Sequence, residues 1–269
     1  MTGTDEVFNT AVKAARLAGK IIVENLGKLS KEDVHLKQSS DFVTRVDKES
    51  EEIIITTIRE IFPHHHFLAE ESLNQVGTDQ YRWIIDPLDG TTNFIHGYPV
   101  FSVSIALEYQ REIILGVIFD PLRDELFTAE KGRGSFLNKR PIKVSAVRDI
   151  EYSMIATGFP FRRKEFIDLY LELFKNVFLK VSDLRRAGSA ALDLAYLACG
   201  RCEGFFEIGL SPWDIAAGEI MIREAGGIVT DFGGGGDYLS TGNIVAGTPL
   251  IHEMLLKEAI KAFAGIVDK

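Results

Sequence analysis

The order of hydrophobic patterns along the chain constrains its fold more than any other feature. Apolar residues recur at helical spacing over residues 7–22 and again from Val46 to Ile61, where Pro63 ends the pattern, so two amphipathic helices are predicted first. Short runs of β-branched and aromatic residues, bounded by turn residues, then predict strands at His66–Ala69, Tyr81–Ile85, Phe101–Leu107, Ile113–Phe119 and Glu125–Ala129. The third and fourth of these runs are expected to form a hairpin that turns at Glu108–Arg111.

From about Ala146 onward the pattern changes to an alternation of helices and strands. Helices are expected at Lys164–Leu179, Ser189–Cys199, Asp214–Ala225 and Pro249–Ala264, and strands at Tyr152–Ala156, Gly204–Ile208, Gly227–Thr230 and Asn243–Ala246. The first half therefore reads as α+β and the second as layered α/β. No Pro/Ser-rich linker separates them, so the 269 residues are expected to form one large domain or two halves, 1–146 and 147–269, that share a cleft.

Charge excludes some classes of function. The formal net charge of −9 argues against a dedicated nucleic-acid binder, because phosphate backbones are held mainly by Lys and Arg. The segment Met1–Asn25 carries charged residues inside its apolar pattern, so it is expected to be neither a secretion signal nor a membrane span. A cytoplasmic location without membrane association is the resulting expectation. An acidic protein that acts on a phosphate needs cations to reverse its local field.

The segment Trp83–Asn93 reads W-I-I-D-P-L-D-G-T-T-N, an apolar strand followed by two carboxylates, a glycine and two hydroxyls. Pro87 cannot donate a ladder hydrogen bond, so the strand is expected to stop there and the chain to turn. Such a turn can aim Asp86 and Asp89 at one point, where carboxylates suit hard cations. Gly90 and the start of a helix after it offer close backbone N–H donors for a phosphate. The alternative is a surface turn with an Asp cap, which explains fewer of these residues together.

Further acidic residues lie at the ends of two other predicted elements. Glu70 and Glu71 follow the strand His66–Ala69, and only one of them is expected to enter a site, because adjacent residues of an extended segment point in opposite directions. Asp214 opens a helix whose residues Ala216–Gly218 are small enough for backbone or ligand to approach closely. Taken alone, Asp214 is better explained as a helix cap. Beside the other acidic segments it becomes a candidate metal ligand.

Several conspicuous patterns have a plainer explanation. Cys199 and Cys202 in C-G-R-C close a helix rather than open one, which favours two buried, reduced thiols over a redox pair. The triplet His64–His66 is expected to be a polar turn rather than a soft-metal site. The run Gly233–Gly236 lacks the Lys and Ser/Thr of a phosphate loop and predicts a surface turn.

The three acidic segments, in this order, resemble the inositol monophosphatase family of magnesium-dependent, lithium-sensitive phosphatases. The resemblance extends over nearly the whole chain, and the stretch Leu184–Gly247 is similar to the bacterial inositol-1-monophosphatase branch. It implies the layered αβαβα sandwich shared with fructose-1,6-bisphosphatase, an α+β fold with the active site between the two halves. It also implies a homodimer.

The resemblance implies two to three Mg²⁺ ions, with Mn²⁺ as a substitute. One metal would be held by Glu70, Asp86 and the backbone carbonyl of Leu88, a second by Asp86, Asp89 and Asp214, and a third, weaker ion would lie near Glu70. Paired ions roughly 4 Å apart can bind a phosphate, lower the pKa of a water and stabilise the departing alkoxide. Most of the ligands would lie in the first half, and Asp214 in the second.

The same resemblance assigns residues to the phosphate, the water and the alcohol. Backbone N–H groups of Gly90 and Thr91 would hold phosphate oxygens. The Thr91 hydroxyl, oriented by Asp47, would help position the attacking water, and Thr44-Arg45-Val46-Asp47 also has the spacing of a capping box. The residues implied at the alcohol side are Gly188, Ser189, Ala190 and Glu207, although a solvent-facing strand position explains Glu207 equally well. The segment Lys37–Asp41 matches a loop that closes over the metals in relatives.

The resulting hypothesis is a Mg²⁺-dependent hydrolase of small phosphorylated polyols, above all of inositol 1-phosphate, by metal-activated water. Fructose-1,6-bisphosphatase activity, alone or in addition, and action on histidinol phosphate remain open. A second phosphate would need basic partners, and Arg162, Arg163, Arg185 and Arg186 are candidates that may instead form ion pairs across a subunit interface. From a different class, the chain may serve as a protein partner of the transcription machinery, as some bacterial relatives do.

Overall fold

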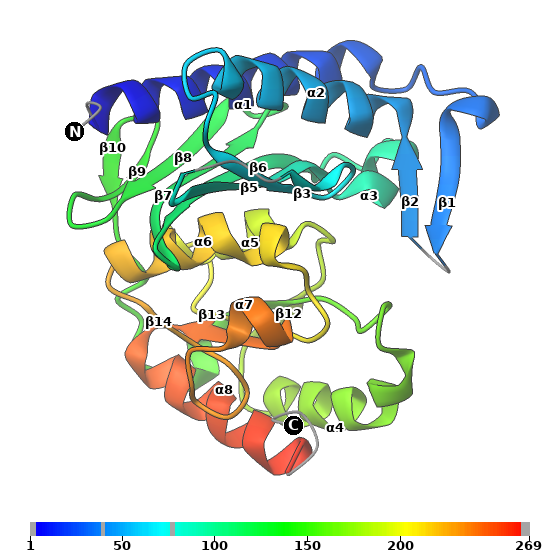
Figure 1. The fold of residues 1–269 in the computed structure, drawn as a ribbon. Helices are drawn as coiled ribbons and strands as arrows, with labels where there is room; N and C mark the ends of the chain where they lie inside the picture. Colours follow the sequence, from blue (N-terminus) through cyan, green and yellow to red (C-terminus); the bar gives the residue numbers. More distant parts are fainter. Residues whose placement is uncertain (1–3, 39–40, 76–78, 265–269) are drawn as a thin grey trace.

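The computed structural model describes residues 4–38, 41–75 and 79–264. These residues form five layers in the order helices, sheet, helices, sheet, helices (Figure 1). The predicted αβαβα sandwich is therefore confirmed. The division into halves 1–146 and 147–269 stays a prediction, since α5 (Ala190–Ala198) and α6 (Pro212–Glu224) share one hydrophobic cluster with both sheets.

The first two layers contain most of the N-terminal part of the chain. Helices α1 (Thr4–Asn25) and α2 (Arg45–Arg59) lie on one face of an eight-stranded sheet, whose strand order is β10-β9-β8-β7-β6-β5-β3-β4 (Figure 1). The strands are β3 (His66–Ala69), β4 (Leu73–Gln75), β5 (Tyr81–Asp89), β6 (Ser102–Tyr109), β7 (Glu112–Asp120), β8 (Glu125–Glu130), β9 (Gly134–Leu137) and β10 (Arg140–Ile142). The predicted hairpin is confirmed as β6–β7, and its turn residues Gln110 and Arg111 have φ of 52° and 68°.

The second sheet has five strands in the order β12-β11-β13-β15-β14, and α5 and α6 separate it from the first. Its strands are β11 (Met154–Thr157), β12 (Asp183–Arg185), β13 (Gly204–Glu207), β14 (Ile228–Thr230) and β15 (Ile244–Gly247). Helices α4 (Ile167–Phe178) and α8 (Pro249–Ala262) cover its outer face (Figure 1). The remaining short elements are η1 (Lys31–Asp33), β1 (Val34–Gln38), β2 (Asp41–Thr44), α3 (Thr91–Ile95), η2 (Ile150–Tyr152), η3 (Lys164–Phe166) and α7 (Tyr238–Thr241).

Three hydrophobic clusters fill the spaces between the layers. One lies between α1–α2 and the first sheet, a second surrounds α5 and α6, and a third lies between the second sheet and α4–α8. Small residues set the close spacing in the middle: a Cβ on Gly116 of β7 would lie 2.6 Å from the carbonyl oxygen of Ala217, and one on Gly218 would lie 2.4 Å from Leu194 Cβ. The absence of a side chain at Gly116 lets β7 lie close to α6, and its absence at Gly218 lets α6 lie close to α5.

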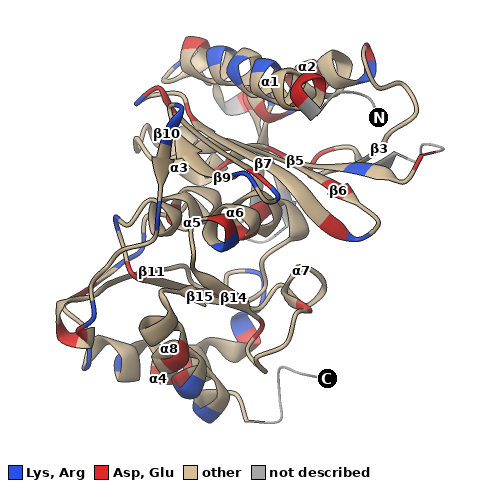
Figure 2. Cartoon of the chain, turned by 90° about the vertical axis from the view of Figure 1, so that its left-hand side faces the viewer, with Lys and Arg blue, Asp and Glu red and all other residues tan. Residues whose placement is uncertain are grey.

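Charged residues lie mainly on the outside of these layers. Figure 2 shows Lys and Arg interspersed with Asp and Glu along α1 and α2, whereas the strands between the layers are mostly uncharged. Within the described ranges, no helix combines the length and the apolar character that a membrane crossing requires.

Candidate active site

A β-bulge near the end of β5 brings Asp86 and Asp89 together. The prediction that this strand ends at Pro87 is wrong, because β5 continues to Asp89. Asp86 pairs with Ser104 and Asp89 with Ser102, so β5 carries one residue more than β6 between these pairs. Side chains three apart on a regular strand point to opposite faces, and the extra residue brings them to the same face. Pro87 is tolerated in the bulge, where no ladder hydrogen bond is required of it.

Asp214 reaches the same point from the opposite layer. Ser211 is the N-cap of α6, and Asp214 is the third helical residue, whose Oδ2 accepts a hydrogen bond from the Ser211 N–H at 2.7 Å. One carboxylate oxygen from each of Asp86, Asp89 and Asp214 lies within 4.8 Å of the others. The cap role and the candidate ligand role of Asp214 are therefore compatible.

The electrostatics of this cluster favour a bound cation. Burial, followed by repulsion from Glu70, Asp89 and Asp214, raises the pKa of Asp86 well above its ordinary value. Burial and then Asp214 raise the pKa of Asp89 to about 7, although hydrogen bonds from Ser189, Ala191 and Ala190 oppose the shift. Carboxylates crowded in this way are stabilised by a hard divalent ion with oxygen ligands. The residues therefore fit the metal that the resemblance implies.

Glu70 approaches the cluster from the end of β3. Strand β3 runs parallel to β5, with Ala69 beside Ile85, and the Glu70 N–H donates to the Ile85 carbonyl at 3.2 Å. Glu70 is therefore held next to Asp86. Of the adjacent pair, Glu70 and not Glu71 lines the cavity, as the alternation argument predicted.

Asp47 links the start of α2 to Thr91. The predicted capping box is confirmed: Thr44 accepts hydrogen bonds from the first helical turn, and the Thr44 N–H donates to Asp47 Oδ2 at 2.9 Å. The other oxygen, Oδ1, lies 2.8 Å from the Thr91 hydroxyl, which also lies 3.1 Å from the Leu88 carbonyl oxygen. Asp47 is fully buried and holds Thr91 while it caps α2. Both predicted positions of Asp47 are thus present in one side chain.

Gly90 makes the turn from β5 into α3. Its φ of 97° lies in the left-handed region, and a Cβ would lie 2.9 Å from the carbonyl oxygen of Val100. Any other residue would be strained by the backbone conformation and by the lack of space. Gly90 is the N-cap of α3, so the first N–H groups of this helix open toward the cavity that Gly90, Thr91 and Thr92 line.

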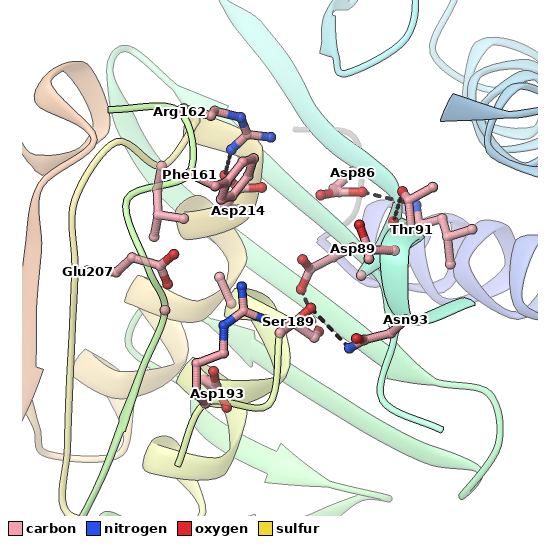
Figure 3. A pocket seen from close by; sticks show the side chains of 18 of the residues that line it. Asp86, Asp89, Thr91, Asn93, Phe161, Arg162, Ser189, Asp193, Glu207 and Asp214 are labelled. Carbon is pink, nitrogen blue, oxygen red and sulfur yellow. Dashed lines mark hydrogen bonds and ion pairs between the residues drawn. The ribbon is translucent and has the colours of Figure 1, made fainter. Parts of the chain in front are cut away.

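The cavity has a volume of about 290 Å³ and lies between the carboxylate cluster and the second sheet (Figure 3). It is lined by every residue predicted to contact metal or substrate: Glu70, Asp86, Leu88, Asp89, Gly90, Thr91, Gly188, Ser189, Ala190, Glu207 and Asp214. Ser189 has a specific task here, because its hydroxyl donates to Asp89 Oδ2 at 2.5 Å and its Oγ caps α5. The substrate roles of Gly188, Ser189, Ala190 and Glu207 stay predictions.

The far end of the cavity contains Glu207, which the resemblance implied, together with Asp193 and Gly158, which sequence reasoning did not assign. Asp193 and Glu207 are buried carboxylates that line the cavity (Figure 3), and Arg186, another lining residue, interacts electrostatically with both. Burial raises the pKa of both acids well above the ordinary range, and Arg186 partly opposes this. Gly158 is packed against Glu207, since a Cβ there would lie 2.0 Å from Glu207 Oε1. The only sequence signal was that Asp193 lies shortly after Gly188, Ser189 and Ala190, in the run R-A-G-S-A-A-L-D of residues 186–193.

Two further lining residues hold the site together. Asn93 Nδ2 lies 2.7 Å from the Val100 carbonyl oxygen and 2.9 Å from that of Ala187, so it joins α3 to the segment before α5. Arg162 Nη1 donates to Asp214 Oδ2 at 3.2 Å and therefore contacts the carboxylate cluster. Asn93 closes the strand–turn motif in the sequence, but its partners were not predictable from spacing.

The other conspicuous sequence patterns lie away from this cavity. Cys199 and Cys202 are free thiols whose pKa values burial raises, which confirms the prediction of reduced cysteines. The triplet His64–His66 leads from a turn into β3 as predicted, but His65 is not polar surface: it is buried between the rings of Phe62 and Tyr81, at 4.8 Å from each. The backbone of Gly233–Gly236 wraps the Asp231 carboxylate. The side chains of residues 37–41, predicted to be a closing loop, lie outside the described part of the chain.

Comparisons with known proteins agree with this geometry. The sequence profile of the inositol monophosphatase family matches residues 4–264. Nus factor SuhB of Escherichia coli strain K12 is 51% identical over 251 residues, 93% of this chain and 94% of that protein. The crystal structure of extragenic suppressor protein SuhB from Bartonella henselae has a TM-score of 0.92 at 48% identity, covering 95% of this chain and 99% of the other.

A second solved structure carries the family's enzymatic name. Inositol monophosphatase from Anabaena (Nostoc) sp. PCC 7120 has a TM-score of 0.86 at 41% identity, covering 96% of this chain and 97% of the other. The layered fold, the buried carboxylate cluster and the matches along almost the whole sequence lead to one conclusion. The chain belongs to the inositol monophosphatase family.

Proposed function

We propose that this chain is a Mg²⁺-dependent phosphatase of small phosphomonoesters, with inositol 1-phosphate as its principal substrate. The observation that carries the proposal is one cavity with a carboxylate cluster, Asp86, Asp89 and Asp214, at one end and two buried acids, Asp193 and Glu207, beside an arginine at the other. The first group suits metal-bound phosphate, and the second suits a hydroxyl-rich alcohol. Family membership supports a phosphatase.

Two to three ions would be held by side chains already in place. Glu70, Asp86 and the Leu88 carbonyl would hold one, and Asp86, Asp89 and Asp214 another. When bound, the ions supply positive charge to the phosphate and the leaving oxygen, and they lower the pKa of a water. All-oxygen ligands favour Mg²⁺, with Mn²⁺ as a substitute.

Thr91 and Asp47 would orient the water. Asp47 Oδ2 is occupied by Thr44, so Oδ1 is fixed on the Thr91 hydroxyl. A hydroxyl that donates its single hydrogen bond to Asp47 keeps its oxygen as an acceptor, which can accept a hydrogen bond from the attacking water and so orient it. The N–H groups of Gly90 and Thr91 would bind the phosphate oxygens.

Asp193 and Glu207 would recognise the alcohol. Burial is the largest cause of the raised pKa of both carboxyls, and both line the cavity where a substrate would lie. Buried carboxylates are stabilised by hydrogen-bond donors, and the hydroxyls of a polyol would supply such donors here. The positive charge of Arg186 partly compensates the two acids and opposes the rise in the pKa of each. A polyol phosphate therefore suits this end better than an apolar ester does.

Phosphate release tests the proposal. Inositol 1-phosphate and fructose 1,6-bisphosphate should be compared with Mg²⁺, with chelator and with added Li⁺. We expect Mg²⁺-dependent release from the inositol ester that Li⁺ inhibits. Faster release from the bisphosphate would instead favour fructose-1,6-bisphosphatase activity and would assign the second phosphate to Arg162 or Arg186, which both line the cavity.

A second candidate role is binding to the transcription machinery, because relatives at 51% identity are named Nus factors. Asp89→Asn separates the two roles: it should abolish phosphate release and leave binding to the transcription complex unchanged. Loss of both would mean that binding depends on an intact metal site. Release that survives in Asp89→Asn would contradict the proposed chemistry.

We also propose that the protein forms a homodimer through α4. Helix α4 exposes an apolar stripe, Ile167, Leu171 and Phe178, on a face beside that of its buried residues Tyr170, Leu173 and Val177. Leu171→Asp should give a monomer by light scattering, whereas Ile260→Asp, at an exposed apolar position on α8, should not. A wild-type monomer would contradict this proposal.

A further inference from the structure

Helix α2 presents two buried carboxylates one helical turn apart, and the proposed mechanism uses only one of them. Asp47 is fully buried and Glu51 is 3% exposed, although both lie in the charged stretch Arg45–Glu52. Residues four apart lie on the same face of a helix. This face points toward the candidate active site, where Asp47 holds Thr91.

Glu51 accepts two hydrogen bonds from the segment that directly follows Glu70. Its Oε2 accepts a hydrogen bond from the Glu71 N–H at 2.8 Å, and its Oε1 accepts one from the Ser72 N–H, also at 2.8 Å. On the other side, the Glu70 N–H is bonded to the Ile85 carbonyl of β5. Glu70 thus lies between a strand hydrogen bond and a two-oxygen clamp from α2. Hydrogen bonds to a carboxylate are shorter and stronger than neutral ones, so this clamp is stiff.

We propose that Glu51 is a positioning residue that fixes the Glu70 carboxylate in the metal site, as Asp47 fixes the Thr91 hydroxyl. The inference rests on the proposed function, because it requires that Glu70 bind metal. Helix α2 then orients two parts of the site at once: the water-orienting hydroxyl through Asp47 and a metal ligand through Glu51. Residues that orient metal ligands typically change metal affinity about 10- to 100-fold when they are replaced.

Glu51→Gln tests the inference with little change in size. The amide keeps one acceptor oxygen but turns an NH₂ group toward the other backbone N–H, so one of the two bonds is lost. Mn²⁺ binding to metal-free protein, followed by electron paramagnetic resonance of the free ion, should weaken about 10-fold. Glu51→Asp keeps the charge but is too short to reach both N–H groups, and it should weaken binding similarly. This second variant covers the case in which Glu51→Gln does not fold.

Glu224→Gln is a matched control. Glu224 accepts hydrogen bonds from the Gly132 and Gly134 N–H groups, one to each oxygen, at 2.8 and 2.9 Å. It makes the same kind of clamp, but it lies ten residues along α6 from Asp214, about 15 Å along the helix axis. The control variant should lower the melting temperature and leave Mn²⁺ affinity unchanged.

A double-variant cycle shows whether Glu51 acts through Glu70. If it does, Glu51→Gln should weaken Mn²⁺ binding less than about twofold when Glu70 is already replaced by Gln. Independent, multiplying effects would overturn the inference, as would a Glu51→Gln variant that lowers only the melting temperature. Wild-type protein that binds no Mn²⁺ would overturn both the inference and the proposed function, whereas normal wild-type binding with unchanged Glu51 variants would overturn the inference alone.

Discussion

Replacing Asp89 with Asn should stabilise the metal-free protein, by an amount that depends on pH. Burial and the charge of Asp214 raise the pKa of Asp89 from 3.8 to about 7. The folded state therefore keeps a proton that the unfolded state releases, and the free energy of unfolding falls as pH rises through this window. A shift of about 3 units corresponds to about 4 kcal/mol once the pH exceeds 7. Asn carries no charge and removes this loss.

The magnitude between two convenient pH values follows from the same linkage. The free energy of unfolding of the wild type falls mainly between about pH 5 and the folded pKa of about 7, a span of roughly 2 units. Between about pH 5 and about pH 8, the stability of Asp89→Asn relative to the wild type should therefore increase by about 3 kcal/mol. The assay is urea unfolding of chelator-stripped protein, followed by the fluorescence of Trp83 and Trp213. Added Mg²⁺ should reverse the order, because it stabilises only the protein that binds it. A difference that stays constant within about 1 kcal/mol from pH 5 to pH 8 would refute the reasoning.

Three other substitutions probe separate parts of the account. Asp47→Asn leaves one carbonyl oxygen to serve both the cap of α2 and the bond to Thr91. It should therefore lower the free energy of unfolding by about 1–2 kcal/mol in urea and reduce kcat more than Mn²⁺ affinity. An unchanged kcat would contradict the role of Thr91. Gly158→Ala should raise KM for inositol 1-phosphate and spare Mn²⁺ binding, since its Cβ would displace the Glu207 carboxylate. Gly116→Ala should lower the free energy of unfolding by about 1–3 kcal/mol, because the added Cβ would meet the Ala217 carbonyl oxygen. If the urea concentration at half-unfolding is the same for the variant and the wild type, β7 and α6 can move apart at this point.

Local patterns were enough to predict most of the fold. The strand His66–Ala69 and the capping box at Thr44 and Asp47 are written in consecutive residues, where spacing and side-chain type decide the structure. The short strands β1, β2, β4, β9, β10 and β12 were not predicted, because runs of three to five residues carry too little alternation to stand out from a loop. The bulge at Pro87 was misread, since proline ends a regular strand but is tolerated in a bulge.

The candidate site divides in the same way. The metal-ligand candidates Asp86, Asp89 and Asp214 are found from three short segments, and the resemblance adds their shared purpose. Gly158 and Asp193 cannot be found in this way, because Gly158 is marked by its contact with Glu207 and Asp193 by its position in the cavity and its electrostatic interaction with Arg186. Glu51 is similar: its partners lie 20 and 21 residues away.

The measurement that tests the central claim most directly is the anomalous scattering of Mn²⁺ in crystals of the protein soaked with the metal and inorganic phosphate. We predict Mn²⁺ bound by the carboxylates of Asp86, Asp89 and Asp214, a second ion that contacts Glu70, and phosphate between the ions and the N–H groups of Gly90 and Thr91. Mn²⁺ found only outside this cavity, with Arg162 still bonded to Asp214, would contradict the account.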